Sequence, residues 1–206
     1  MKNYSLDTKV INNHANTIIQ NLQEESLSVY VFLQEQWNST SAIENTLFQF
    51  VFRSFYRIDN AGLTDEFKIK YFELLEGSRN SNPNLRDICK CLYTIPNRKG
   101  LNSLQFSFAT KLANTVDSSL PIFDSEVAKV YNFKVPASVI PIDNRLTTLL
   151  SFYQNISDDY ERIIKSGSLD YTISMFDEKF SKYSTTIGQN KKLDFIVWSA
   201  GKILNK

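Results

Sequence analysis

Residues 101–124 read LNSLQFSFATKLANTVDSSLPIFD, and this stretch decides how the rest of the chain is interpreted. Its apolar side chains recur at helical spacing, because Leu104, Phe108 and Leu112 lie four residues apart from one another. Such a stripe is typical of an amphipathic helix that buries one face. We therefore predict a helix over residues 103–116.

Two ionisable residues in this stretch are the candidates for chemistry. Lys111 lies about 100° around the helix from the centre of the apolar stripe, on a flank from which a side chain can lean over a groove. Residues 117–123 form a tight connection, and Asp124 is suited to N-cap the following helix. A helix followed by so short a reversal of the chain can bring the side chains of Lys111 and Asp124 to the opening of the same pocket. These two residues are the candidate catalytic pair.

The same periodicity extends over most of the chain and predicts an all-α fold. Six Gly and five Pro among 206 residues, and no hairpin signal, argue against a β architecture. The stretch 41–58 is apolar nearly all round, so we expect a central buried helix there. The expected helices span residues 8–25, 27–37, 41–58, 64–77, 85–95, 103–116, 124–132, 143–166, 169–183 and 192–204.

Length and composition suit a compact helical domain. A chain of 206 residues with 42% hydrophobic content can bury a core without disulfides or metal. We expect residues 1–206 to form one multi-helix domain that can divide into two lobes at a hinge near residues 78–84. Cys89 and Cys91 point apart on a helix, and His14 is the single histidine. No disulfide, metal site or cofactor is therefore expected.

The charge balance gives the chain no bulk attraction for nucleic acid, because the net charge is only +1. Basic residues nevertheless cluster between Arg86 and Lys111 and again from Lys179 onward. Each cluster is either a local binding face or a solvated helix face. The first residues lack the apolar region of a signal peptide, and no apolar run is long enough to span a bilayer. We therefore expect a cytoplasmic protein without a membrane partner.

Three short sequence features occur in a characteristic order. A helix reads T-K-L-A at residues 110–113, P-x-x-D follows at residues 121–124, and LDFIVWSAGK stands at residues 193–202. The first two resemble the helix-hairpin-helix DNA glycosylases, in particular their 8-oxoguanine DNA glycosylase-like branch, and the match covers residues 87–124. The third is similar to the closing helix of small bacterial proteins with this fold. The resemblance implies a divergent bacterial member with a two-lobed helical fold and DNA as its partner.

The resemblance assigns roles to the candidate pair. Lys111 matches the nucleophilic lysine of the family, which attacks the sugar C1′, and Asp124 matches the aspartate that stabilises the cationic sugar. The implied activity is excision of a damaged or modified base, and the resulting Schiff base permits abasic-site lyase activity. The flipped base is expected against aromatic walls, for which Phe108 and Phe123 are candidates. Core packing is the competing interpretation of both rings.

The phosphate-binding hairpin of the family is altered in this chain. Residues 96–100 replace its glycine-rich turn, and Phe108 and Ala109 stand where glycines are expected. Phosphate binding therefore falls to side chains and to the start of the next helix. The residues assigned to it are Arg98, Lys99, Asn102 and Ser103. The alternatives are a catalytically inactive protein of this fold that binds nucleic acid or a protein partner, and a purely structural helical partner protein.

Overall fold

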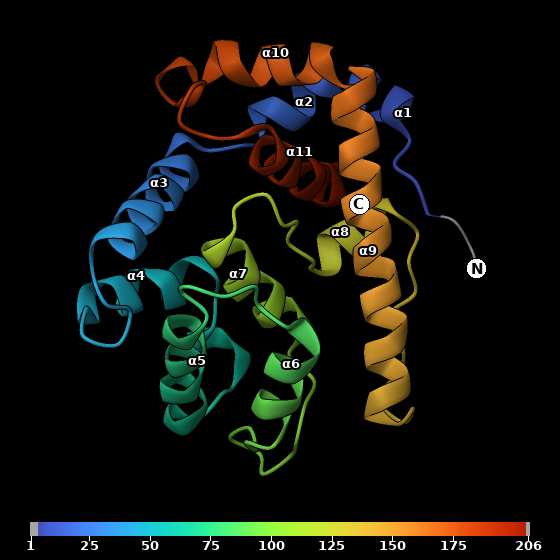
Figure 1. Ribbon diagram of the computed structural model, residues 1–206. Coiled ribbons are helices and arrows are strands. Elements are labelled where there is room, and N and C mark those ends of the chain that lie inside the picture. Colours follow the sequence, from blue (N-terminus) through green and yellow to red (C-terminus); the bar gives the residue numbers. More distant parts are fainter. Residues whose placement is uncertain (1–3, 205–206) are drawn as a thin grey trace. The chain divides into compact units, whose positions relative to one another are not determined.

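The computed structural model describes residues 4–204, and every regular element in that range is a helix (Figure 1). The predicted all-α class is therefore confirmed. The chain forms two compact units: the first combines the residues up to Leu27 with those from Ser118 onward, and the second runs from Ser28 to Asp117. Residues 78–84, the expected hinge, connect two helices inside the second unit.

Loops of one to twelve residues join the helices of each unit. The first unit contains α1 (Thr8–Asn13), α2 (Ala15–Gln20), α8 (Ser125–Val130), α9 (Ile142–Ser166), α10 (Asp170–Lys179), the 3-10 helix η2 (Ser181–Tyr183) and α11 (Gln189–Leu204). The second contains α4 (Thr46–Phe55), the 3-10 helix η1 (Asp59–Ala61), α5 (Asp65–Gly77), α6 (Leu85–Tyr93) and α7 (Phe106–Val116). The chain passes from the first unit into the second within α3 (Glu24–Ser39). Within residues 4–204, no helix combines the length and apolar character needed to cross a membrane.

Helix α11 forms the core of the first unit, where it packs against α2, α8 and α9 (Figure 1). It is buried on all sides over residues 191–197, because apolar residues lie on every face of it. The Ser199 hydroxyl links it to α2 by donating to the Ile18 carbonyl at 2.7 Å. At Gly201 the backbone of α8 comes so close that a Cβ would lie 2.4 Å from the Glu126 carbonyl oxygen.

The second unit is built around aromatic side chains of α4 and α5. Phe48, Phe52, Tyr71 and Phe72 are buried, and their ring centroids lie 5.5 to 6.2 Å apart in edge-on or tilted pairs. The Tyr71 hydroxyl donates to the backbone carbonyl of Phe108 at 3.0 Å. This bond fastens α5 to α7, the helix that carries Lys111.

The helix expected over residues 41–58 is shorter and less buried than predicted. The Asn45 side chain accepts from the Phe48 amide at 2.9 Å, and this N-cap makes α4 begin at the next residue. Leu47 and Phe50 are each 60% exposed, because only one face of α4 packs against the unit. The prediction of a helix buried all round was wrong.

The helix predicted over residues 8–25 is divided at His14 into α1 and α2. Asparagine and histidine are weak helix formers, and here the Asn12 side chain bonds elsewhere. It donates to the Ser168 carbonyl at 2.9 Å and accepts from the Thr172 hydroxyl at 2.7 Å. The start of the chain is thereby tied to α10.

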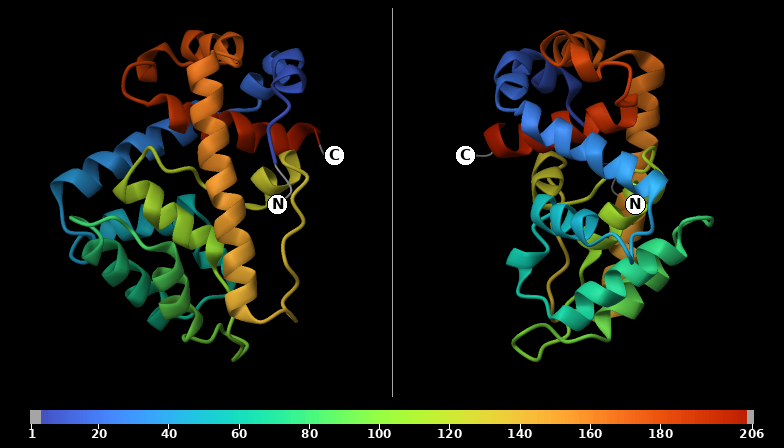
Figure 2. Two further views of the ribbon diagram at one scale, coloured as in Figure 1. Left: turned by 45° about the vertical axis from the view of Figure 1, so that its right-hand side comes forward. Right: turned by 90° about the vertical axis from the view of Figure 1, so that its left-hand side faces the viewer.

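Other helix boundaries follow the predicted signals. The Thr64 hydroxyl caps α5 by accepting from the Phe67 amide at 3.3 Å. Gly167 ends α9 in the left-handed conformation, with φ of 65°. Before Gly167, α9 is unbroken over its 25 residues, from Ile142 to Ser166 (Figure 2). Local capping chemistry therefore sets these ends.

Replacement of Gly201 by alanine is expected to destabilise the protein by about 1–3 kcal/mol, because the added methyl group overlaps the α8 backbone. Gly77→Ala is the matched control, since Gly77 is also helical and a Cβ there meets nothing within 4 Å. The control is expected to gain about 0.5–1 kcal/mol. Urea unfolding measures both changes, and equal midpoints for the two variants would contradict the close approach of α8.

Candidate functional site

The amine of Lys111 lies among aromatic side chains of the second unit. Lys111 is half-buried on α7, and its Nζ donates to the Ser107 hydroxyl at 3.1 Å. The ring centroids of Phe108 and Tyr56 lie 5.0 and 5.7 Å from the same nitrogen, within the range of a cation–π contact. The prediction of one apolar stripe with Lys111 on its flank was wrong, because α7 is buried on nearly every face and Lys111 lies on the narrow side that remains partly exposed.

Helix α7 begins three residues later than predicted. Its N-cap is Gln105, and the Gln105 side chain donates to the Ser103 hydroxyl at 2.8 Å instead of capping the helix. Asn102 and Ser103 therefore lie in irregular backbone before the helix. They are not among the first amides of α7, which are the groups that bind an anion at a helix N-terminus. The predicted start of the helix at Ser103 is thus wrong, and a phosphate-binding role of Asn102 and Ser103 stays a prediction.

The backbone amides of the turn before α7 already have partners inside the protein. The Arg98 amide donates to the Gly62 carbonyl at 2.9 Å, and the Gly100 amide donates to the Asn97 carbonyl at 2.8 Å. The Asn97 side chain accepts from the Lys99 amide at 2.9 Å. These amides cannot also bind a phosphate. The exposed side chains of Arg98, Lys99 and Asn102 remain for that task.

Asp124 N-caps α8, as predicted. Its Oδ1 accepts from the amides of Glu126 and Val127 at 2.9 and 3.0 Å, and the residue is half-buried. Both cap bonds use the same oxygen, so Oδ2 is outside the cap. Asp124 belongs to the first unit and Lys111 to the second. That their side chains lie at the opening of one pocket stays a prediction.

The two rings assigned to the base pocket are buried in their own units. Phe108 lies beside the Lys111 amine. Phe123 contacts Phe133 and Phe152 edge-on, with ring centroids 6.3 and 5.9 Å apart. The latter two rings stack on each other at 3.8 Å. Phe123 therefore packs in the core of the first unit, and a base-pocket role stays a prediction for both residues.

A buried polar cluster on α11 was missed by the sequence analysis. Lys191 and Asp194 are 4% and 6% exposed, and Lys191 Nζ lies 3.4 Å from Asp194 Oδ2. Asp194 Oδ1 accepts from the Ile122 amide at 3.0 Å and from the Tyr160 hydroxyl at 3.3 Å. The cluster thus joins α11 and α9 to the segment that leads into Asp124.

The lysines of the C-terminal region are therefore not all on a solvated or binding face. Lys192 is also buried, pairs with Asp177 at 2.6 Å and donates to the Ser184 carbonyl at 2.8 Å. The sequence did carry a signal: Lys191 and Asp194 are three residues apart in a helix with apolar residues on every face. Charges at that spacing in such a helix can pair inside the core.

Burial determines the ionisation of this cluster. It raises the pKa of Asp194 to about 6, although the Lys191 charge and the Ile122 amide act in the opposite direction. Burial lowers the pKa of Lys191, and attraction to Asp194 and Asp124 opposes that effect. The pKa of Tyr160 is raised by burial and by the same two carboxylates. The charge of Asp124 therefore acts on the buried cluster as well as on its own helix.

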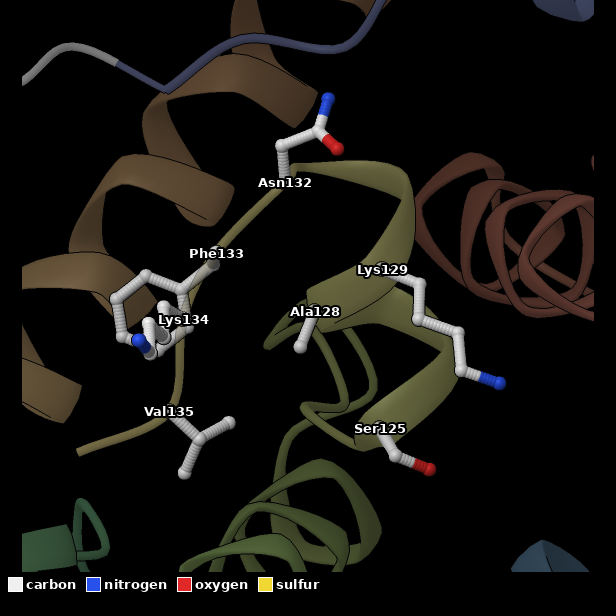
Figure 3. Close-up of a pocket in the computed structure, with 7 residues that line it drawn as sticks. All are labelled: Ser125, Ala128, Lys129, Asn132, Phe133, Lys134 and Val135. Carbon is white, nitrogen blue, oxygen red and sulfur yellow. The ribbon is translucent and has the colours of Figure 1, made fainter. Parts of the chain in front are cut away.

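An open hollow of about 460 Å³ lies between α8 and the segment that follows it (Figure 3). Ala128 on the helix points toward Val135 on the following segment. Lys129 and Lys134 also line the hollow, and so does Ser125, which directly follows Asp124. The hollow therefore combines apolar surface with two cations beside the candidate carboxylate.

The raised pKa of Asp194 makes folding stability depend on pH. Between about pH 4 and pH 6 the folded protein holds a proton on Asp194 that the unfolded chain has lost. This contribution to stability is fully present below about pH 4 and is lost as the pH rises to about 6. Relative to Asp194→Asn, the unmodified protein is expected to lose about 1–3 kcal/mol of unfolding free energy across this window. Urea unfolding at several pH values measures the difference, and a constant difference would contradict the shift.

Comparison with known proteins gives no match to this chain among family models, curated proteins or solved structures. The resemblance to the helix-hairpin-helix DNA glycosylases therefore rests on the residues themselves, chiefly Lys111, Pro121 and Asp124. A functional hypothesis for this chain therefore depends on the contacts that these residues make.

Proposed function

We propose that this protein is a glycosylase-like enzyme that excises a damaged or modified base from DNA, with Lys111 as nucleophile and Asp124 as electrostatic partner. One observation carries most of the proposal. The Lys111 amine is half-buried against the rings of Phe108 and Tyr56 and bonded to the Ser107 hydroxyl. A lysine stem in apolar surroundings can deliver its nitrogen to a substrate while water is kept away from the stem.

The proposed reaction begins when the neutral Lys111 amine attacks the sugar C1′ of an extruded nucleotide. A bond forms between Nζ and C1′, and the glycosidic bond breaks with its electron pair leaving on the base. Loss of a proton from nitrogen and opening of the sugar ring give a Schiff base. A general base then removes a proton from C2′ of this Schiff base, the C3′–O bond breaks and the 3′ phosphate leaves, which cleaves the strand. Addition of water to the Schiff-base carbon then releases Lys111.

Asp124 suits the second role because the cap of α8 fixes its carboxylate. Oδ1 is held by the amides of Glu126 and Val127, and neither of these bonds uses Oδ2. A fixed negative charge stabilises the positive charge that develops on the sugar as the base leaves. The same carboxylate can accept the proton that the Lys111 nitrogen releases.

DNA would be bound through side chains in this proposal. Arg98 and Lys99 are exposed on the turn before α7, and Lys134 is exposed on the hollow beside α8. Contacts from such cations to phosphates set the register of a strand without reading its sequence. The hollow adds apolar surface from Ala128 and Val135 against which part of a nucleotide can pack.

Trapping with borohydride tests the proposed chemistry, because it reduces the Schiff base to a stable adduct. The substrates are duplexes that each carry one damaged or modified base. We expect an adduct with the unmodified protein, none with Lys111→Ala, and a trapping rate lowered by about 10²-fold or more with Asp124→Asn. Lys165→Ala, which alters an exposed lysine at the end of α9, is the matched control and should trap normally. The absence of an adduct with every base, or full activity of Lys111→Ala, would reject the proposal.

The second candidate is a protein of the same fold that binds DNA without catalysis. The observation in its favour is the turn before α7, where the amides of Arg98, Lys99 and Gly100 bond within the protein. A protein that cannot use these amides has weaker means of fixing a strand for chemistry, although its cations can still bind DNA. This candidate predicts binding without base release.

Salt dependence of duplex binding, measured by fluorescence anisotropy, tests the phosphate contacts. Arg98→Ala and Lys99→Ala are each expected to reduce the slope of log affinity against log salt by about one. Lys182→Ala, in η2, is the control and should leave the slope unchanged. An unchanged slope in the first two variants would contradict the assigned contacts. Normal binding without any trapped adduct would favour the second candidate over the first.

A further inference from the structure

The segment that leads into Asp124 is held by side chains from two helices of the first unit. The Tyr153 hydroxyl on α9 donates to the Pro121 carbonyl at 2.8 Å. The amide of the next residue, Ile122, donates to Asp194 Oδ1 on α11 at 3.0 Å. Because both bonds go to main-chain atoms, they fix the course of the backbone two residues before Asp124.

Asp194 is itself fixed by its surroundings. Tyr160 donates to its Oδ1 at 3.3 Å, and the Lys191 amine lies 3.4 Å from its Oδ2. None of these three side chains is more than 6% exposed, so water does not compete for their contacts. A carboxylate bound on both oxygens in a dry site keeps one orientation, and this orientation passes to the Ile122 amide.

Helix α11 also fixes the chain on the other side of Asp124. Gly201 admits the backbone of α8 so closely that a Cβ would lie 2.4 Å from the Glu126 carbonyl oxygen. The Glu126 amide is one of the two that bind the Asp124 carboxylate. Asp124 therefore lies between two points, Ile122 and Glu126, that α11 holds in place.

An ordinary helix cap does not need this support. An N-cap requires only the aspartate and the first amides of its helix. A buried ion pair such as Lys191 with Asp194 costs free energy relative to apolar side chains of the same volume. Electrostatic stabilisation of a reacting group, in contrast, depends on placement, since an error of about 1 Å lowers a rate by about 10²-fold. The buried cluster of Lys191, Asp194 and Tyr160 therefore suits accurate placement of the Asp124 carboxylate better than it suits stabilisation of the fold.

We propose that Asp194 is a positioning residue, which, together with Tyr153, sets the place of the Asp124 carboxylate through the backbone of Pro121 and Ile122. The catalytic consequence rests on the proposed function of Asp124. The claim that Asp194 and Tyr153 hold the start of α8 in place does not rest on that function.

The principal variant is Tyr153→Phe, which removes one hydroxyl and keeps the ring. The control is Thr172→Val, which removes a buried hydroxyl of α10 that donates to Asn12 Oδ1 at 2.7 Å and makes no bond to the segment before Asp124 or to α8. Asp194→Asn, which keeps an acceptor oxygen for the Ile122 amide, is compared with Asp194→Leu, which removes it. Urea unfolding of all four variants gives the loss of stability against which the other readouts are compared.

Amide hydrogen exchange at Glu126 and Val127 measures how well the Asp124 cap is held. We expect exchange to quicken by about tenfold in Tyr153→Phe and more in Asp194→Leu, with partial rescue in Asp194→Asn and no change in Thr172→Val. The single-turnover trapping rate should fall by about 10- to 100-fold in the same order, while the DNA dissociation constant stays within about twofold.

The outcomes separate the positioning role of Asp194 from the proposed function of the protein. If exchange and trapping in Tyr153→Phe match those in Thr172→Val, the positioning role is overturned. If exchange quickens as expected but even the unmodified protein forms no adduct, the proposed function fails and the placement of Asp124 by Asp194 stands. If exchange and rate change together while DNA affinity is retained, both are supported.

Discussion

The burial of α11 is the constraint on which the first unit depends. Over residues 191–197 no face of α11 reaches water, so the charges there must be satisfied by their surroundings. Lys191 and Asp194 satisfy each other, and the remaining capacity of Asp194 is taken by Tyr160 and by the Ile122 amide. That last bond joins residues 72 positions apart. The core helix therefore organises a loop as well as the helices around it.

Features set by neighbouring residues could be predicted from the sequence. The all-α class followed from apolar periodicity, and the cap at Asp124 followed from a short polar side chain directly before a helix. The ends of α9 followed from Gly167 and from the prolines before the helix.

Features set by residues far apart could not be predicted in this way. Leu47 and Phe50 are as apolar as their buried neighbours, and only the packing of α4 decides which face reaches water. The burial of Lys191 depends on α9 and on the loop before α8 closing over it. The amides around Asn97 bond partly to its side chain and partly to Gly62, so composition gave no sign that they were occupied. Hydropathy indicates whether a side chain tends to be buried or exposed, and tertiary packing decides which residues it contacts.

The first unit is assembled from two stretches of chain with the whole second unit between them. Its N-terminal helices pack against α10 and α11, and one hydrogen bond in that contact spans 181 residues. The second unit is continuous, and its helices contact neighbours close in sequence, which favours fast folding. During synthesis the second unit can therefore fold while α1 and α2 are still without their core. Those helices acquire their partners only when α10 and α11 emerge, and α8 with its carboxylate acquires its main partner last, with α11.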